Sequence, residues 1–220
     1  MSATALPDAV PWHLLPGPLV MIDLETTGVR VQSDRIVELA AVRKAPGEPT
    51  LVLNTLVDHG RRTVGATHVH GITRRMLDGA PTIEEVLPLL EALCAGATMV
   101  AHNASFEHRF LSAEMDRSGG LWALPRLCTL ALSRRLHPER KGNPGHRLGG
   151  MADLYEVPVR NAHSALGDVR MMSGVLGGML RRHADLGKLP RFLAESIRTP
   201  EERTAWPRSR GGVRLKPRLT

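Results

Sequence analysis

The sequence is poor in cysteine, in aromatic residues and in long apolar runs. Cys94 and Cys128 are the only thiols and lie far apart, which excludes a disulfide framework or a cysteine-rich zinc module and suits a reducing compartment. Aromatic residues make up 3% of the chain, too few for an extended platform on which bases stack. The early apolar run from Leu19 to Ile22 is far too short to span a bilayer. We therefore expect a cytoplasmic protein with no membrane partner.

Acidic residues are also in the minority. The 220 residues include 29 Lys and Arg against 22 Asp and Glu, and the sequence pI is near 10.4. Arginine dominates the excess, and its guanidinium group can hydrogen-bond two phosphate oxygens at once. This balance favours nucleic acid or anionic lipid as a partner, although a solvated basic face explains it equally well. Charge alone leaves the partner open.

The pattern of apolar residues predicts strands first and helices later. Residues 18–25, 35–44 and 50–57 read as three strands with short connections, which is typical of an antiparallel meander. Shorter strands are expected at 98–101 and 127–129, and helices after 82–85, after 103, over 148–155 and over 164–182. The fold class is therefore α/β, with a mixed β-sheet flanked by helices in residues 18–188. An irregular lead-in (1–17) and a basic, flexible tail (189–220) complete the expected organisation.

Asp23 and Glu25 lie two residues apart at the end of the first apolar strand, so both carboxylates project from the same face. Two ionised carboxylates repel each other and are costly beside an apolar core without a cation. Ligands that are all oxygen favour Mg²⁺ or Mn²⁺ over Zn²⁺. Because such a triplet often arises by chance, it indicates a metal site only in combination with other residues.

Asp168 lies early in the longest predicted helix, and His163 lies at or just before the start of that helix. A helix-capping aspartate and a surface histidine are the ordinary explanations of the two residues. If both were helical they would not share one narrow face, but a non-helical His163 can reach a metal held by Asp168. His68 and His70 have no third nitrogen or sulfur ligand nearby, which argues against zinc.

Four motifs occur in order along the chain: D-L-E-T-T-G at 23–28, V-H-G-I-T at 69–73, A-H-N-A-S-F-E at 101–107 and H-x-A-x-x-D at 163–168. Together they resemble the DEDDh branch of the DnaQ-like 3′–5′ exonucleases, and most closely the proofreading-subunit group of bacterial DNA polymerase III. The resemblance covers roughly residues 18–182. It implies a ribonuclease H-like exonuclease fold and hydrolysis of phosphodiester bonds at the 3′ end of single-stranded or frayed DNA. The implied products are nucleoside 5′-monophosphates, and the implied setting is DNA repair, end trimming or proofreading.

The resemblance also assigns roles to individual residues. Asp23, Glu25 and Asp168 match the carboxylates that bind two divalent ions, Mg²⁺ or Mn²⁺, and Asp23 is expected to bridge them. His163 matches the general base. Two such ions activate water on one side of the phosphate and stabilise the leaving oxygen on the other.

Substrate contacts follow from the same resemblance. His70 matches a histidine that contacts substrate near the scissile phosphate, and main chain from Leu24 to Thr26 would hold the 3′-terminal nucleotide. Two positions depart from the family pattern. Glu107 stands where the family has its fourth metal-binding carboxylate as Asp, so we expect altered geometry at the second metal and weakened or Mn²⁺-favouring activity. Gly65 stands where the proofreading group has an acidic residue, so one contact to the terminal nucleotide or its water is expected to be missing.

Two alternative functions stay open: a nucleic-acid-binding module with weakened catalysis, and an exonuclease that trims RNA 3′ ends. A polymerase or repair partner is implied, but no docking segment is recognisable. Residues 191–220 carry eight basic against three acidic residues, and this tail either raises affinity for nucleic acid electrostatically or has no function. A further basic group suits either a surface that tracks a single strand or a solvated loop: Arg134, Arg135, Arg140, Lys141 and Arg147.

Overall fold

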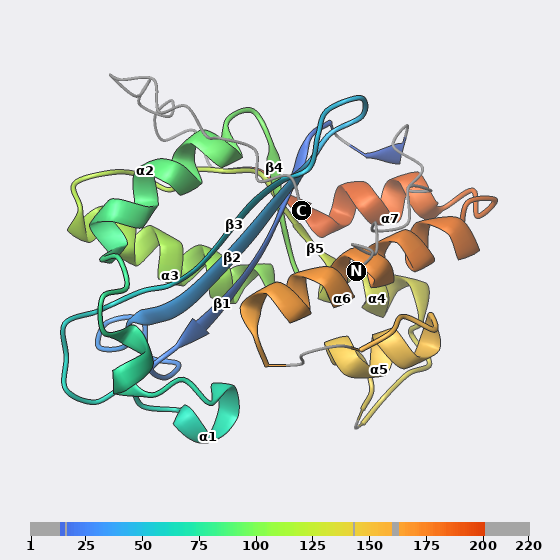
Figure 1. Ribbon diagram of the computed structural model, residues 1–220. Coiled ribbons are helices and arrows are strands. Elements are labelled where there is room, and N and C mark those ends of the chain that lie inside the picture. Colours follow the sequence, from blue (N-terminus) through green and yellow to red (C-terminus); the bar gives the residue numbers. More distant parts are fainter. Residues whose placement is uncertain (1–13, 16, 143, 160–162, 201–220) are drawn as a thin grey trace.

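Six strands form one mixed sheet in the computed structural model, which describes residues 14–15, 17–142, 144–159 and 163–200 (Figure 1). The strands are β1 (Leu19–Thr26), β2 (Ile36–Lys44), β3 (Leu51–Leu56), β4 (Thr98–Ala101), β5 (Arg126–Cys128) and β6 (Ile197–Arg198). They are ordered β3-β2-β1-β4-β5-β6. The first three form the predicted antiparallel meander, β1, β4 and β5 are parallel, and β6 is antiparallel to β5. The predicted mixed sheet is confirmed.

Helices cover both faces of this sheet (Figure 1). Helices α2 (Ile83–Cys94) and α3 (Ala104–Arg117) pack on one face. The opposite face carries α4 (Thr129–Leu136), α5 (Leu148–Leu154), α6 (Ala165–Arg182) and α7 (Leu189–Ser196). The connection from β3 to α2 contains α1 (Thr67–His70) and the 3₁₀ helix η2 (Arg74–Leu77). None of the described helices combines the length and the apolar character needed to cross a membrane.

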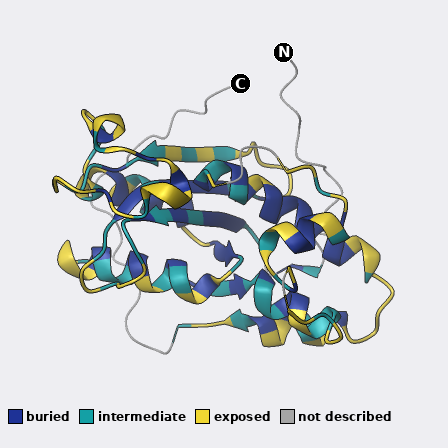
Figure 2. Cartoon of the chain, turned by 90° about the horizontal axis from the view of Figure 1, so that it is seen from below, coloured by how far each residue is buried: buried dark blue, intermediate teal, exposed yellow. Residues whose placement is uncertain are grey.

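Strand β1 lies at the centre of the sheet and contributes to both core layers. Val20, Ile22 and Leu24 pack with α2 and α3, whereas Leu19 and Met21 pack with α6 and its neighbours. Figure 2 shows the buried residues concentrated in the central strands and on the sheet-facing sides of the helices. Because side chains alternate along a strand, the two residues that continue the Leu19 and Met21 series, at positions 23 and 25, project toward the side of the sheet that α6 covers.

Helix α6 approaches its neighbours closely through two glycines one turn apart. A Cβ atom on Gly174 would lie 2.6 Å from Val157, and one on Gly178 would lie 2.8 Å from the ring of Tyr155. Both distances are shorter than carbon–carbon contact allows. The absence of a side chain at these positions therefore fixes how the segment after α5 sits against α6.

The folded domain extends past the expected boundary at residue 188. Residues 189–198 form α7, whose Leu189 and Leu193 are buried, and β6, which pairs with β5. Pro190 lies in the first turn of α7, where a missing N–H costs no hydrogen bond. Helix α4, α1 and η2 are further elements that the pattern of the sequence did not predict. Residues 1–13 of the lead-in and 201–220 of the tail lie outside the described residues.

Candidate active site

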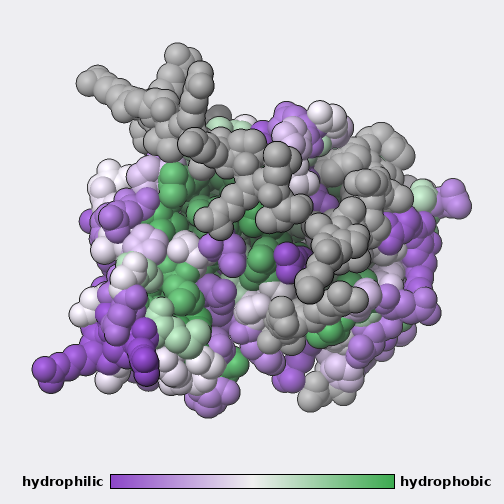
Figure 3. Space-filling view, viewed as in Figure 1, coloured by the Kyte–Doolittle hydropathy of each residue, from purple (hydrophilic) through white to green (hydrophobic). Residues whose placement is uncertain are grey.

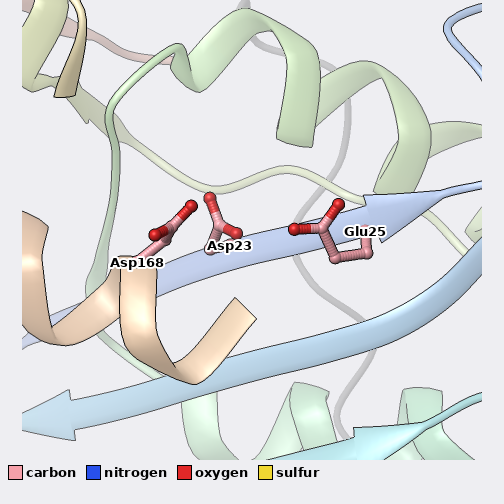
Figure 4. A group of neighbouring side chains, drawn as sticks. All are labelled: Asp23, Glu25 and Asp168. Atoms are coloured by element: carbon pink, nitrogen blue, oxygen red, sulfur yellow. The ribbon is translucent and has the colours of Figure 1, made fainter. Parts of the chain in front are cut away.

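Three carboxylates meet where the end of β1 faces the start of α6. Asp23 and Glu25 come from β1 and Asp168 from the first turn of α6, and each offers an oxygen within 4.8 Å of the others. Figure 4 shows the carboxylate of Asp168 pointing toward that of Asp23, with Glu25 further along the strand. Three oxygen donors at this separation fit a hard divalent cation. Sequence reasoning expected these three residues to converge, and the fold brings them together.

The electrostatic environment of this cluster is unfavourable without a cation. Burial raises the pKa of Asp23 well above its ordinary value, and the charged neighbours that raise it further are all acidic: Glu107, Asp168, Glu25 and Glu38. Burial, with Asp168 and Glu38, also raises the pKa of Glu25 to about 7. Carboxylates that repel one another in a desolvated site are stabilised in their charged form when a metal ion binds.

Glu38 on β2 is a residue of this site that sequence reasoning missed. It pairs across the strands with Glu25, and its Oε2 accepts a hydrogen bond of 3.0 Å from the backbone N–H of Ala165, the first residue of α6. Burial raises the pKa of Glu38, the bond from Ala165 lowers it, and Asp168 raises it. Glu38 thus ties the start of α6 to the sheet. The available signal was a lone charge in the otherwise apolar stretch from Ile36 to Val42.

Glu107 is buried in the first turn of α3, with 5% of its surface exposed. Its charge has the largest effect on Asp23 of any charged neighbour, yet Glu107 lies outside the group of three oxygen donors. Burial raises the pKa of Glu107 to about 8, and its Oε2 has no hydrogen-bond partner among the described residues. A buried carboxylate oxygen without a partner is costly, so a ligand at this position would stabilise it.

His163 lies outside the helix, as expected. Its backbone is left-handed (φ 65°) and its side chain is exposed. Ser164 caps α6, accepting a hydrogen bond of 3.2 Å from the N–H of Gly167. The pKa of Asp168 is raised by burial and lowered by the charge and the main-chain hydrogen bond of His163. His163 is therefore held next to a carboxylate of the cluster without sharing its helix.

His70 is buried at the end of α1. Its Nδ1 accepts a hydrogen bond of 3.0 Å from the N–H of Ile72. Burial lowers the pKa of His70, so the ring is neutral at pH 7 and its proton is on Nε2. Main-chain groups of Gly65 and Thr26 act on the same ring. The structure thus places His70 beside the end of β1, next to the segment that sequence reasoning assigned to the terminal nucleotide.

That segment departs from regular strand geometry. The register with β2 shifts between Glu25 and Thr26, and Thr26 Oγ1 donates a hydrogen bond of 2.6 Å to the carbonyl of Gly28. Leu24, in contrast, is a buried residue of the core. A bulge of this kind re-aims the backbone at the end of a strand.

Gly65 occupies a position that no side chain can take with this backbone. It has a left-handed conformation (φ 61°), and a Cβ atom there would lie 2.2 Å from the carbonyl oxygen of Thr27. An acidic side chain, as in the family pattern, would therefore not fit at position 65 with this backbone. The close contact between this loop and the end of β1 requires glycine.

A family model described as Exonuclease, of the RNase T type, matches residues 20–176. The chain belongs to this exonuclease family. Curated relatives include the PolC-type DNA polymerase III of Lacticaseibacillus paracasei, 34% identical over 182 residues, and a putative bifunctional exonuclease/endonuclease of Mycobacterium tuberculosis, 35% identical over 176 residues. These matches cover 80% and 76% of this chain but only 12% and 27% of the relatives.

Solved structures confirm the fold. Exonuclease X in complex with 5′ overhanging duplex DNA is 27% identical with a TM-score of 0.61, and the match covers 80% of this chain and 98% of that one. Exonuclease I of E. coli in complex with a dT13 oligonucleotide has a TM-score of 0.68 at 18% identity, covering 77% of this chain and 42% of that one. Together with the family match, they confirm the DnaQ-like assignment and the ribonuclease H-like exonuclease fold.

Proposed function

We propose that the protein is a metal-dependent 3′–5′ exonuclease that hydrolyses phosphodiester bonds at the 3′ end of single-stranded or frayed DNA and releases nucleoside 5′-monophosphates. The observation that carries this proposal is the convergence of Asp23, Glu25 and Asp168 within 4.8 Å, in a desolvated site whose strongest charged neighbours are also acidic. A phosphodiester is itself an anion, so a site of this charge can accept it only together with cations.

The chain's own residues then have distinct tasks. Asp23, Glu25 and Asp168 would hold two divalent ions, Mg²⁺ or Mn²⁺, and Glu107 would be the fourth carboxylate ligand. Such ions supply charge neutralisation and a nucleophilic water at neutral pH. His163, exposed beside Asp168, takes the proton of the attacking water as general base.

Substrate positioning is proposed for the side chain of His70 and for the main chain at the end of β1. His70, neutral and with its proton on Nε2, is a donor for an oxygen near the scissile phosphate. The bulged segment ending at Thr26 holds the 3′-terminal nucleotide, with Leu24 packed beneath it in the core. Gly65 leaves out one contact that an acidic residue would have made.

The comparisons support DNA as the substrate. The Exonuclease X and Exonuclease I structures contain a 5′ overhanging duplex and a dT13 oligonucleotide. The PolC-type relatives are named as DNA polymerases, which supports association with a polymerase or repair protein in the cytoplasm. Since the chain spans a small share of these relatives, its role in proofreading or repair is part of the proposal.

The experiment uses the purified chain with DNA and RNA oligonucleotides labelled at the 3′ or the 5′ end, in Mg²⁺, Mn²⁺ or a chelator. We expect 5′-labelled DNA to shorten from its 3′ end only with metal, and His163→Ala to lower kcat by about 10²- to 10⁴-fold. His68→Ala, which removes an exposed histidine, is the matched control. Shortening of 3′-labelled DNA from the 5′ end, or faster degradation of RNA, would overturn the polarity or the substrate.

One observation favours a second candidate, a binding module with weakened catalysis. Glu107 lies outside the group of three donors although the family pattern makes it a ligand. Glu107→Asp separates the candidates. For an exonuclease that merely tolerates the longer side chain, the variant keeps or raises activity in Mg²⁺. If wild type and variant both bind DNA without degrading it in either metal, the binding module is correct.

A further inference from the structure

A basic hollow of about 460 Å³ lies between α4, the start of α5 and the loop that joins them. Three of its lining residues are positively charged, Arg134, Lys141 and Arg147, and the rings of His102 and His146 also line it. The remaining lining residues are small or apolar, and none of the described lining residues is acidic. In Figure 3 the side of the molecule where Figure 1 places α4 and α5 is mainly hydrophilic. An anion is the ligand that suits such a lining.

The hollow opens at the same edge of the sheet as the carboxylate cluster. Strands β1 and β4 run parallel with Met21 opposite Val100, so continuing the register brings His102 level with Asp23. Adjacent strands lie about 4.8 Å apart. The hollow is therefore next to the active site, on the side of β4 and β5, and is lined by none of the three clustered carboxylates.

Hydrogen bonds hold the wall of the hollow in place. His102 Nε2 lies 2.8 Å from the carbonyl oxygen of His146, and its Nδ1 lies 3.0 Å from Thr129 Oγ1. Because a carbonyl can only accept, Nε2 carries the proton. Ser133 Oγ donates to the carbonyl of Leu130 (2.8 Å) and thus accepts from His146 Nδ1 (3.0 Å). These contacts tie the loop at His146 to the end of β4 and to α4, so the hollow is preformed.

The fold separates the five basic residues of this region into two groups. Arg135 pairs with Glu195 at 3.1 Å, and Arg140 donates to the carbonyls of Gly145 and Gly150, so both serve the structure. Arg134, Lys141 and Arg147 line the hollow and are exposed. They form no ion pair with other residues in the part of the chain that the structure describes.

We propose that Arg134, Lys141 and Arg147 form a second binding site, which holds a backbone phosphate of the DNA strand whose 3′ end lies at the carboxylate cluster. This site rests on the proposed function, since the exonuclease activity defines the strand. Arg134 and Arg147 provide guanidinium forks that match phosphate oxygens. The hollow guides the part of the strand that has not yet been cleaved.

The test measures binding of a 5′-fluorescein-labelled oligothymidylate in chelator, by anisotropy over a range of salt concentrations. The double variant Arg134→Ala/Lys141→Ala is expected to weaken binding at least tenfold at low salt. Loss of contact with this one phosphate should reduce the magnitude of the slope of log K against log[salt] by about 0.7 for a single strand. Arg135→Ala, on the same helix but outside the hollow, is the matched control and should change affinity less than twofold.

A separate assay distinguishes failure of this site from failure of the proposed function. Wild-type protein is incubated with the same oligonucleotide in Mg²⁺ or Mn²⁺. If it degrades the DNA while the double variant binds no more weakly than Arg135→Ala, the second site is refuted and the exonuclease stands. If wild type never degrades DNA but the double variant loses affinity and slope as expected, the exonuclease is refuted and the hollow is a site for nucleic acid.

Discussion

Replacing Glu107 by Gln should change how the stability of the metal-free protein depends on pH. The pKa of this buried side chain is raised from 4.5 to about 8 by burial. An acid whose pKa is higher in the folded state stabilises the fold fully below pH 4.5 and loses that contribution as pH rises toward 8. At about 1.4 kcal/mol per pKa unit, Glu107 alone costs about 2–3 kcal/mol of unfolding free energy between pH 5 and pH 7. Gln has no charge to bury, so Glu107→Gln escapes this loss.

The assay is urea unfolding in a chelator at pH 5, 6, 7 and 8. Buried neutral histidines such as His102, whose pKa is lowered mainly by burial, change stability in the opposite sense. The useful quantity is therefore the difference between variant and wild type, in which the histidines cancel. This difference should move in favour of Glu107→Gln by about 2–3 kcal/mol from pH 5 to pH 7. For the control Glu84→Gln on the exposed side of α2, it should stay within about 0.5 kcal/mol. If the difference in unfolding free energy between Glu107→Gln and wild type does not change with pH, burial does not raise the pKa of Glu107 in the metal-free protein.

Three further predictions follow from the same site. Mn²⁺ at a hundredfold excess over its Kd should raise the unfolding free energy of the wild type at pH 7 by about 2.7 kcal/mol, measured by thermal or urea unfolding. If Asp23→Asn gained the same unfolding free energy from Mn²⁺, the proposed metal site would be wrong. Gly65→Ala should destabilise the fold by more than the roughly 1–2 kcal/mol that a left-handed alanine costs, because the new Cβ atom would lie 2.2 Å from the carbonyl oxygen of Thr27. Gly60→Ala, with φ 71° and open space around it, is the control and should show the conformational cost alone. Equal losses of unfolding free energy in urea would mean that the loop of Gly65 moves aside. Glu38→Ala should lower the unfolding free energy by about 1.5–3 kcal/mol, the contribution of a hydrogen bond to a charged group, and should also lower activity. Glu38→Gln keeps an acceptor for the N–H of Ala165 and should recover most of the unfolding free energy. If it recovers none, the charge of Glu38 matters rather than the hydrogen bond.

Much of the fold could be predicted because apolar periodicity and burial have the same cause. The three-strand meander and β4 follow from apolar runs of strand length, and the long helix α6 follows from apolar residues that recur every three or four positions. The helix expected after residues 82–85 begins there as α2, with Glu85 accepting a hydrogen bond of 2.8 Å from the N–H of Thr82. Elements that the pattern missed are short or depend on partners far away in sequence: α1 has four residues, and β6 exists because two residues pair with β5.

The site was predictable to the extent that it lies on single elements. Asp23 and Glu25 share a strand face, so their alignment follows from strand geometry alone. Glu38 could not be placed in the same way, because its role depends on the register that sets it opposite Glu25. The five basic residues after α4 begins are close in sequence, but only side-chain contacts with Glu195, Gly145 and Gly150 separate those that serve the structure from those that face the hollow.

The close contact of Gly174 and Gly178 in α6 with Val157 and Tyr155 connects the carboxylate cluster to a distant part of the molecule. Asp168 is ten residues from Gly178, about 15 Å along a rigid helix at 1.5 Å per residue. Any side chain that pushes Gly178 away from Tyr155 would shift α6 as a unit, and Asp168 with it, while Asp23 stays on the sheet. The spacing between these two carboxylates is consequently open to adjustment from outside the site, and directed evolution of metal preference could begin at residues 155, 157, 174 and 178.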